Sequence, residues 1–227
     1  MRKYAVIVAG GAGLRMGADK PKQFLLLKDK PILFYTLNQF LCAYADIEII
    51  LVLPKEFLFE GQLLVDAFEA SANITIVEGG LTRFHSVKNG LLHIKEEGIV
   101  FVHDGVRCLV SIELIHRCYE QAVQKGSAIP AVAATDSIRI VEGETNFVAD
   151  RNQVRIIQTP QTFQTALLLP AFEIDFQESF TDEATVLEAL GNKVHLIEGE
   201  YGNIKITRPL DLLIAEKIVE KKIDTYN

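Results

Sequence analysis

Cysteine is scarce in this sequence, and its few cysteines follow no metal-binding or disulfide spacing. Three occur in 227 residues, at Cys42, Cys108 and Cys118, and the sequence has no CxxC pair. Small secreted domains held by disulfides carry more cysteines, and zinc sites need clustered ligands. The sequence therefore predicts neither a disulfide framework nor a structural zinc site, and we expect a reducing, cytoplasmic location.

Positive charge and long apolar runs are also limited. The chain carries 23 Lys+Arg against 30 Asp+Glu, a formal net charge of -7. Such a chain lacks the basic surface that attracts duplex nucleic acid or an anionic membrane. Apolar stretches such as 49–53 are strand-sized, and the apolar run at 4–9 stops at Gly10, too early for a signal peptide or a membrane span. We expect no nucleic-acid or membrane partner. Any charged ligand should be at most a small anion.

Short runs rich in Val and Ile alternate with segments of helical spacing. The runs lie at 4–9, 48–53, 74–78, 99–103, 128–134, 156–158 and 194–198. Between most of them apolar residues recur three or four positions apart, as at Leu33 and Leu37 or Leu114 and Cys118. This alternation is typical of a mostly parallel sheet covered by helices on both faces. At about 150 residues per domain, the sequence predicts one α/β domain over 1–227.

One segment interrupts this alternation. Residues 137–142 and 147–151 are predicted to be two strands joined by a turn at 143–146, which gives a β-arm at about 137–152. Its apolar side chains would share one face, and an isolated two-stranded hairpin is marginally stable in water. We therefore expect a partner to cover the arm, and a second copy of the chain, in a homodimer, is the plainest candidate.

The segment after the first predicted strand combines glycines with cations. The strand runs into Gly10, Gly11, Gly13 and Arg15, and Lys22 follows on a non-periodic stretch. Glycines allow backbone N–H groups to approach a phosphate or a base. Two cations beside such a pocket suit a triphosphate whose charge rises at the reacting phosphorus, whereas the spacing fits a dinucleotide loop poorly. An ordinary turn with solvated surface cations is the alternative.

Six further motifs follow in order and carry a family resemblance. They are GGLTRFHSV at 79–87, VHDGVR at 102–107, DR at 150–151, TPQ at 159–161, TDE at 181–183 and NIKITRP at 203–209. With GGAGLRMG and PKQ of the first loop, they resemble the 2-C-methyl-D-erythritol 4-phosphate cytidylyltransferases of the non-mevalonate route to isoprenoids. The chain reads HDGVRC where the family commonly reads HDAARP, and Asp136-Ser137 where it has Asp-Thr. The acid, the base and the hydroxyl are kept in both places.

The resemblance implies both a fold and a reaction. The fold is that of the nucleotide-diphospho-sugar transferases, a Rossmann-like, mixed but mostly parallel sheet flanked by helices, with a protruding β-hairpin arm. The reaction joins CTP and 2-C-methyl-D-erythritol 4-phosphate into 4-diphosphocytidyl-2-C-methyl-D-erythritol and pyrophosphate, with Mg²⁺ or another divalent cation held mainly by the CTP phosphates. Ribitol-5-phosphate cytidylyltransferase shares the CTP half of the motifs and is an alternative. A nucleotide-binding regulator without turnover is a further one.

The matched positions supply the candidate site residues. By resemblance, Arg15, Lys22 and Lys205 stabilise charge on the triphosphate, and Arg151 grips the polyol phosphate. Nucleotide binding is assigned to Ala9, Gly10, Gly11, Gly13, Gly80, Ser86 and Asp104, and substrate binding to Asp104, Arg107, Ser137, Thr159 and Thr181. Asp104 could also contact the metal, directly or through water.

Most of these positions also have a plainer structural explanation. Asp104 falls at the carboxyl end of a predicted central strand, where open α/β sheets bind ligands, but an aspartate there could cap a helix. Arg107 offers a fork for a phosphate, yet could pair with a surface carboxylate. Arg151 and Lys205 could be solvated charges. The residues alone leave these alternatives open.

The hydroxyl and histidine candidates also have structural explanations. Ser86 could reach the base or ribose, or simply begin a helix, and Thr181, which precedes two acidic residues, is a good helix N-cap. His103 is expected to be a packed strand residue, since a phosphate monoester is already anionic at neutral pH and needs no general base. The chemistry then reduces to positioning and charge stabilisation.

Overall fold

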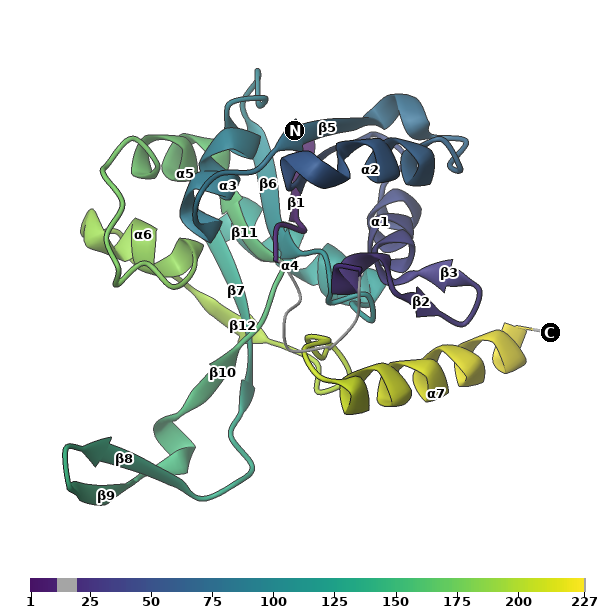
Figure 1. Cartoon of the computed structure of the whole chain (residues 1–227). Helices are drawn as coiled ribbons and strands as arrows, with labels where there is room; N and C mark the ends of the chain where they lie inside the picture. The colour runs from purple at the N-terminus through teal and green to yellow at the C-terminus, as the bar shows by residue number, and fades with distance from the viewer. Residues whose placement is uncertain (12–19, 227) are drawn as a thin grey trace.

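An eight-stranded sheet forms the centre of the structure, a computed structural model that describes residues 1–11 and 20–226 (Figure 1). The strand order is β10-β7-β11-β6-β1-β4-β5, with β12 paired to β7. The bounds are β1 Arg2–Val8, β4 Ile47–Leu53, β5 Ile74–Glu78, β6 Gly98–Asp104, β7 Ser127–Ala133, β10 Arg155–Ile157, β11 Gln161–Gln164 and β12 Leu196–Glu198. The strands β6, β1, β4 and β5 are parallel, whereas β11 is antiparallel to both β6 and β7. The predicted α/β fold with a mixed, mostly parallel sheet is confirmed.

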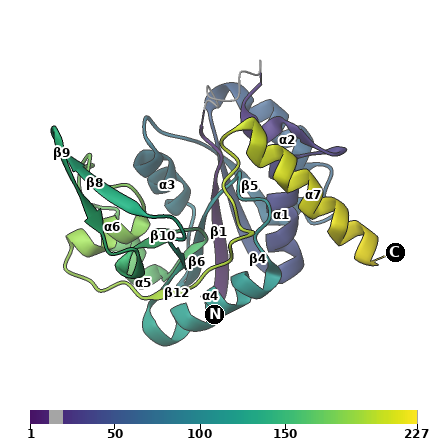
Figure 2. The ribbon, with the colours of Figure 1, turned by 90° about the horizontal axis from the view of Figure 1, so that it is seen from below.

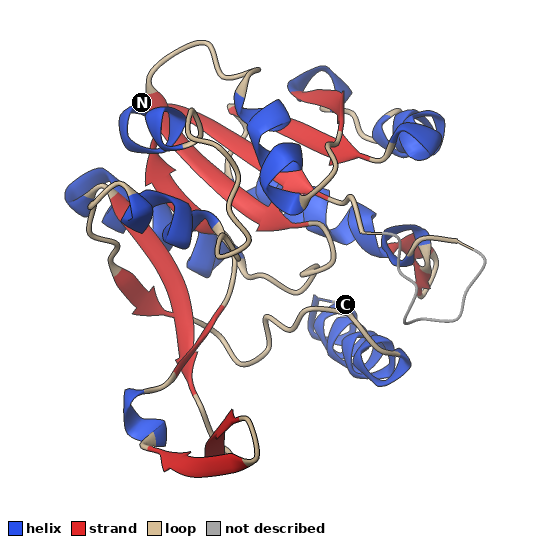
Figure 3. Ribbon diagram, turned by 60° about the vertical axis from the view of Figure 1, so that its left-hand side comes forward, coloured by secondary structure: helices blue, strands red, loops and turns tan. Residues whose placement is uncertain are grey.

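Helices cover both faces of this sheet (Figures 2 and 3). On one face pack α1 Ile32–Ala43, α2 Leu58–Val65 and α4 Ile112–Lys125, and on the other α3 Arg83–Leu91, α5 Thr165–Ala171 and α6 Glu183–Ala189. Within β1, Ala5 and Ile7 join the first core, while Tyr4 and Val6 join the second. Because alternate side chains point to opposite faces, the strand is apolar throughout.

A smaller third core lies under the last helix, α7 Pro209–Tyr226, next to the short strands β2 Leu26–Leu27 and β3 Lys30–Pro31. Ala215 and Val219 are buried there, whereas Leu213 on the same helix is 59% exposed. Thr207 lies two residues before the start of this helix. Its hydroxyl donates to Oδ2 of Asp211, and the same oxygen accepts the backbone N–H groups of Thr207 and Arg208.

The predicted arm is present and stands away from the sheet (Figure 1). It consists of β8 Ile138–Glu142 and β9 Thr145–Ala149, and the short 3-10 helix η5 Arg151–Gln153 follows. Ile138 faces Ala149 and Ile140 faces Phe147, as the shared apolar face requires. The turn contains two residues rather than the expected four, because Gly143 adopts a φ of 59° that suits a tight hairpin.

Strand β11 had no counterpart among the predicted strands. Its residues Gln161, Thr162 and Gln164 are polar, so the segment lacks the Val- and Ile-rich signal, yet it lies between β6 and β7. Side-chain hydrogen bonds compensate for the burial, as where Oε1 of Gln161 accepts the N–H of Ala184 at 2.9 Å. Within the described residues, further 3-10 helices are η2 Lys22–Phe24, η3 Lys55–Phe57 and η4 Ser71–Asn73. Within the described ranges, none of the helices has the length and apolar character needed to cross a membrane.

Candidate active site

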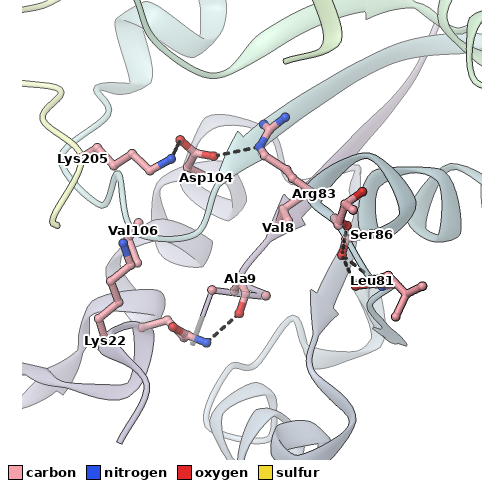
Figure 4. A pocket seen from close by; sticks show the side chains of 14 residues that line it. Val8, Ala9, Lys22, Leu81, Arg83, Ser86, Asp104, Val106 and Lys205 are labelled. Carbon is pink, nitrogen blue, oxygen red and sulfur yellow. Dashed lines mark hydrogen bonds and ion pairs between the residues drawn. The ribbon is translucent and has the colours of Figure 1, made fainter. Parts of the chain in front are cut away.

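The carboxyl ends of β1 and β6 open into a hollow of about 300 Å³, which we call the glycine hollow (Figure 4). This is the edge of the sheet where open α/β folds bind ligands. It is lined by Val8, Ala9, Gly10, Gly11, Lys22, Gln23, Gly80, Leu81, Thr82, Arg83, Ser86, Asp104, Val106 and Lys205. The structure therefore brings together all the predicted nucleotide-binding residues that it describes. Gly13 and Arg15 lie outside the described residues.

One wall of the glycine hollow is the turn between β5 and α3. The Gly80 N–H donates to Oγ of Ser86 at 3.0 Å, and that hydroxyl donates to the Thr82 carbonyl at 3.0 Å. A Cβ atom at Gly80 would overlap His85, so the tight turn requires glycine there. Ser86 lies in the first turn of α3 and also lines the hollow. A structural role at the start of the helix and a contact to the base or ribose are therefore compatible.

The opposite wall comes from the segment around η2. Nζ of Lys22 donates to the Ile206 carbonyl at 3.0 Å, which places the lysine between the first loop and the loop that carries Lys205. Gln23 is buried, and its Nε2 donates to the Ala9 carbonyl at 2.6 Å. This bond ties the η2 segment to the end of β1. Gln23 stands within the PKQ motif, but its role was not predicted.

Asp104, the last residue of β6, is surrounded by three cations. Its Oδ1 lies 3.5 Å from Nε of Arg83, and its Oδ2 lies 3.0 Å from Nζ of Lys205 and 3.3 Å from Nε of Arg107. Burial alone would raise the pKa of Asp104, but the three cations outweigh it and hold the pKa well below its usual range. The carboxyl is therefore ionised, and it acts as an anchor for cations rather than as a helix cap.

A second hollow of about 230 Å³, the acceptor hollow, adjoins the first. It is lined by Arg83, Asp104, Arg107, Ile157, Gln158, Thr159, Gln161, Thr181, Asp182 and Lys205. Three residues, Arg83, Asp104 and Lys205, line both hollows and so form a common wall between them. Two ligands held side by side would meet at these three side chains.

Arg107 directs its donors mainly at the protein itself. Besides the pair with Asp104, its Nη1 donates to the Asn203 carbonyl at 2.8 Å and its Nη2 to the Ile157 carbonyl at 3.5 Å. Nδ2 of Asn203 in turn donates to the Thr159 carbonyl at 2.8 Å. Arg107 thus fixes the loop that carries Lys205. Its expected grip on a polyol phosphate stays a prediction.

Thr159 supports Asp104 from beneath. Its Oγ1 accepts the Asp104 N–H at 3.1 Å and lies 2.9 Å from Nδ1 of His103. Nε2 of His103 lies 3.1 Å from the Arg107 carbonyl, which can only accept, so Nε2 carries the proton and Nδ1 accepts from Thr159. Burial lowers the pKa of His103 to about 3. His103 is the packed strand residue that was expected.

Thr181 is not the N-cap of α6, so this alternative is wrong. The cap is Asp182, whose side chain accepts the Thr185 N–H at 2.9 Å while the Thr185 hydroxyl completes a capping box. Asp182 caps the helix because its carboxylate is a stronger hydrogen-bond acceptor than the hydroxyl of Thr181, one residue earlier. Thr181 is left facing the acceptor hollow.

Ser137 and Arg151 are not brought to either hollow within one chain. Both are exposed at the base of the arm, and Nη1 of Arg151 donates to the Thr135 carbonyl at 3.0 Å. Of the described residues expected to contact the polyol phosphate, these two are missing from the lining of the acceptor hollow. Their roles stay predictions that a single chain does not satisfy.

Two charged residues of the site were not chosen from the sequence. Arg83 lies on the common wall, and both of its terminal nitrogens bind the carboxylate of Glu183. Both residues stand inside recognised motifs, GGLTRFHSV and TDE, from which only Gly80, Ser86 and Thr181 were assigned to the site. A pairing across 100 positions leaves no signal in a single sequence.

The described residues do not build a metal site by themselves. No group of three His, Cys, Asp or Glu that could hold an ion occurs among them, and Asp104 is the one carboxylate in the described lining of the glycine hollow. Its oxygens already face cations. The donor set therefore fits a divalent ion that arrives on phosphate oxygens, with Asp104 as a single additional ligand.

Comparison with known proteins gives a consistent result. The family model described as IspD, 2-C-methyl-D-erythritol 4-phosphate cytidylyltransferase, matches residues 4–221. Enzymes of that name from Phocaeicola vulgatus and Bacteroides thetaiotaomicron are 43% and 45% identical, each over 96% of this chain and 100% of their own length. A 4-diphosphocytidyl-2C-methyl-D-erythritol synthase from Anaerococcus prevotii superposes with a TM-score of 0.83 at 29% identity, covering 96% of this chain and 98% of that one. The cytidylyltransferase of Thermus thermophilus gives 0.76 at 32% identity, over 97% and 100%.

Proposed function

The chain belongs to the 2-C-methyl-D-erythritol 4-phosphate cytidylyltransferase family, and we propose that it joins CTP to 2-C-methyl-D-erythritol 4-phosphate where its two hollows meet. One observation carries this placement: Arg83, Asp104 and Lys205 line both hollows. CTP occupies the glycine hollow and the polyol phosphate occupies the acceptor hollow. The products are 4-diphosphocytidyl-2-C-methyl-D-erythritol and pyrophosphate.

Positioning and charge account for the chemistry. An oxygen of the acceptor phosphate attacks the α-phosphorus of CTP in line. The bond between the α-phosphorus and the oxygen that bridges it to the β-phosphorus breaks, and pyrophosphate leaves with that oxygen. No proton has to be removed from the attacking oxygen. Lys22 and Lys205 reach the glycine hollow from two loops, and Arg15 is proposed to join them on the triphosphate. Fixed cations stabilise the charge that develops at the phosphorus.

A divalent cation, most simply Mg²⁺, would be held mainly by the triphosphate, with Asp104 contributing an oxygen directly or through water. When bound, the ion would neutralise part of the triphosphate charge. Asp104 keeps Lys205 and Arg83 at the common wall, and the half-exposed Lys205 ammonium can turn from its oxygen toward a phosphate.

A homodimer formed through the arm would complete the acceptor hollow. The arm exposes apolar side chains on both of its faces, Ile140 by 43% and Phe147 by 46% on one and Val141 by 71% and Val148 by 67% on the other, and a second copy could cover them. Ser137 and Arg151 lie on this arm and away from their own chain's hollows. An arm that crosses to the neighbouring subunit would bring both residues to the partner's acceptor hollow.

The proposed reaction is tested by incubating the purified protein with CTP, Mg²⁺ and one acceptor at a time, and measuring pyrophosphate release. We expect rapid release with 2-C-methyl-D-erythritol 4-phosphate and little with ribitol 5-phosphate. Preference for ribitol 5-phosphate would instead support the ribitol alternative. Binding of CTP without release with either acceptor would support a regulator.

A further inference from the structure

The guanidinium of Arg83 lies between two carboxylates. Its Nη1 and Nη2 bind the two oxygens of Glu183, with 3.1 Å between Nη2 and Oε2, while its Nε lies 3.5 Å from Oδ1 of Asp104. The planar fork is thereby committed to Glu183, and only its Nε edge faces the site (Figure 4 shows the Asp104 side). Arg83 thus meets the two hollows in one fixed orientation.

The carboxylate of Glu183 is buried, which is unusual for a charged group. Its side chain is 1% exposed, whereas that of Arg83 is 29% exposed, so the acid is the deeper partner. Burying a carboxylate is costly, and a buried ion pair is often no more stabilising than apolar residues of similar size. The pair is therefore not explained by stability alone, and what it does directly is to orient Arg83.

The backbone that carries Glu183 is itself held to the sheet. Nε2 of Gln161 on β11 donates to Oδ2 of Asp182 at 2.9 Å, and Oε1 of the same side chain accepts the Ala184 N–H at 2.9 Å. Gln161 is 1% exposed. These two bonds flank Glu183, so the start of α6 cannot shift relative to β11 without breaking them.

We propose that Glu183 is a positioning residue for cytidylyl transfer, which acts by holding Arg83 flat along the common wall. With its fork on Glu183, Arg83 offers Asp104 one edge and leaves Oδ2 to Lys205 and Arg107. Without Glu183 the fork would turn to Asp104 and compete with Lys205 for the carboxylate. This inference rests on the proposed function, because it concerns the geometry in which the two phosphates meet.

Glu183→Gln keeps the size of the side chain and removes its charge, and Glu188→Gln on the exposed end of α6 is the matched control. We expect Glu183→Gln to lower kcat by roughly 10- to 100-fold, the effect of a small misplacement of a reacting group. The KM for CTP should change less, since the other groups of the glycine hollow are untouched. Glu188→Gln should behave like the wild type.

The second arm of the experiment repeats the change in an Arg83→Gln background. If Glu183 acts through Arg83, Glu183→Gln should then have no further effect on kcat, because its target is gone. An equal fall of kcat in both backgrounds, or a Glu183→Gln variant that matches the control, would overturn the proposal. Melting temperatures identify unfolded variants; if Glu183→Gln does not fold, Glu183→Asp, which withdraws the charge by one methylene, takes its place under the same criteria. An inactive wild-type protein would refute the proposed function instead.

Discussion

Nζ of Lys205 lies 3.0 Å from Oδ2 of Asp104, although one residue comes from the loop before the last helix and the other ends a central strand. The lysine side chain is 41% exposed and the aspartate side chain 10% exposed. The carboxylate is the fixed partner and the ammonium group the one that can move. This relationship makes the site a set of cations held ready by one buried anion, which suits the transfer of a group between two phosphates.

Replacing Lys22 with alanine tests whether a cation of the glycine hollow acts on the reaction or only on binding. We expect kcat to fall roughly 10²- to 10³-fold, as when one charge-stabilising donor is removed from an active site. As a control, Lys193→Ala removes an exposed lysine that lines neither hollow, and it should leave kcat unchanged. Steady-state kinetics with CTP varied would contradict this role if only KM rose.

The glycine hollow should discriminate between bases. Gly10, Gly11 and Gly80 line it without side-chain obstruction, so that backbone groups at Gly10 and Gly11 and the Gly80 carbonyl can bind the edge of cytosine. Buried polar groups left unpaired by a wrong base are costly, so CTP should be strongly preferred to UTP and ATP. Comparing kcat/KM for the three nucleotides measures this preference. Equal kcat/KM values for CTP and UTP would contradict the proposal that the base binds in this hollow.

His103 should make folding stability fall in mild acid. Its folded pKa is lowered by burial to about 3, against an ordinary value of 6.5. Between these values the unfolded chain binds more protons, so the free energy of unfolding decreases as the pH falls below the ordinary pKa. The contribution of His103 at pH 5 relative to pH 8 is about 2 kcal/mol.

Urea unfolding of the wild type and of His103→Gln at both pH values isolates the contribution of His103 to the free energy of unfolding. The wild type should lose about 2 kcal/mol more than the variant between pH 8 and pH 5, because glutamine does not titrate. Changes at other acidic groups are common to both proteins and cancel in the comparison. Equal losses would show that His103 takes up its proton in the folded state at an ordinary pH.

If the arm crosses to a second subunit, two inactive variants should restore each other. Arg151→Ala damages the partner's site, whereas Lys22→Ala damages its own, so a mixed dimer has one intact site and one doubly damaged site. With statistical exchange half of the dimers are mixed, and activity should approach about a quarter of the wild type. Exchange is verified by mass. Activity that stays at the level of the parents would place Arg151 in its own subunit or outside the site.

The fold was largely predictable because its strands are apolar on both faces. The runs at 48–53 and 74–78 match β4 and β5 within one residue, and the arm appears where the alternation is interrupted. Strand β11 was missed since its polar residues are compensated by hydrogen bonds from distant elements. The turn of the arm was placed too widely because its length depends on the φ of Gly143.

The site was predictable only as far as each residue carries its own chemistry. Glycines beside cations indicate phosphate, and an aspartate at a strand end indicates a ligand edge, so Lys22 and Asp104 were chosen from their own chemistry, whereas Lys205 was chosen from the family resemblance. The roles of Gln23 and Glu183 depend on partners far along the chain, which no local pattern reveals. The commitment of Arg107 to the Asn203 carbonyl is likewise a property of the folded chain.

The most direct test of transfer at the common wall follows the phosphate oxygens of the acceptor. The wild-type protein is given CTP and 2-C-methyl-D-erythritol 4-phosphate labelled with heavy oxygen on its phosphate, and both products are analysed by mass. Attack of the acceptor phosphate on the α-phosphorus requires all of the label to appear in the 4-diphosphocytidyl alcohol and none in pyrophosphate. Label in pyrophosphate, or loss of label from the product to water, would contradict the proposed reaction.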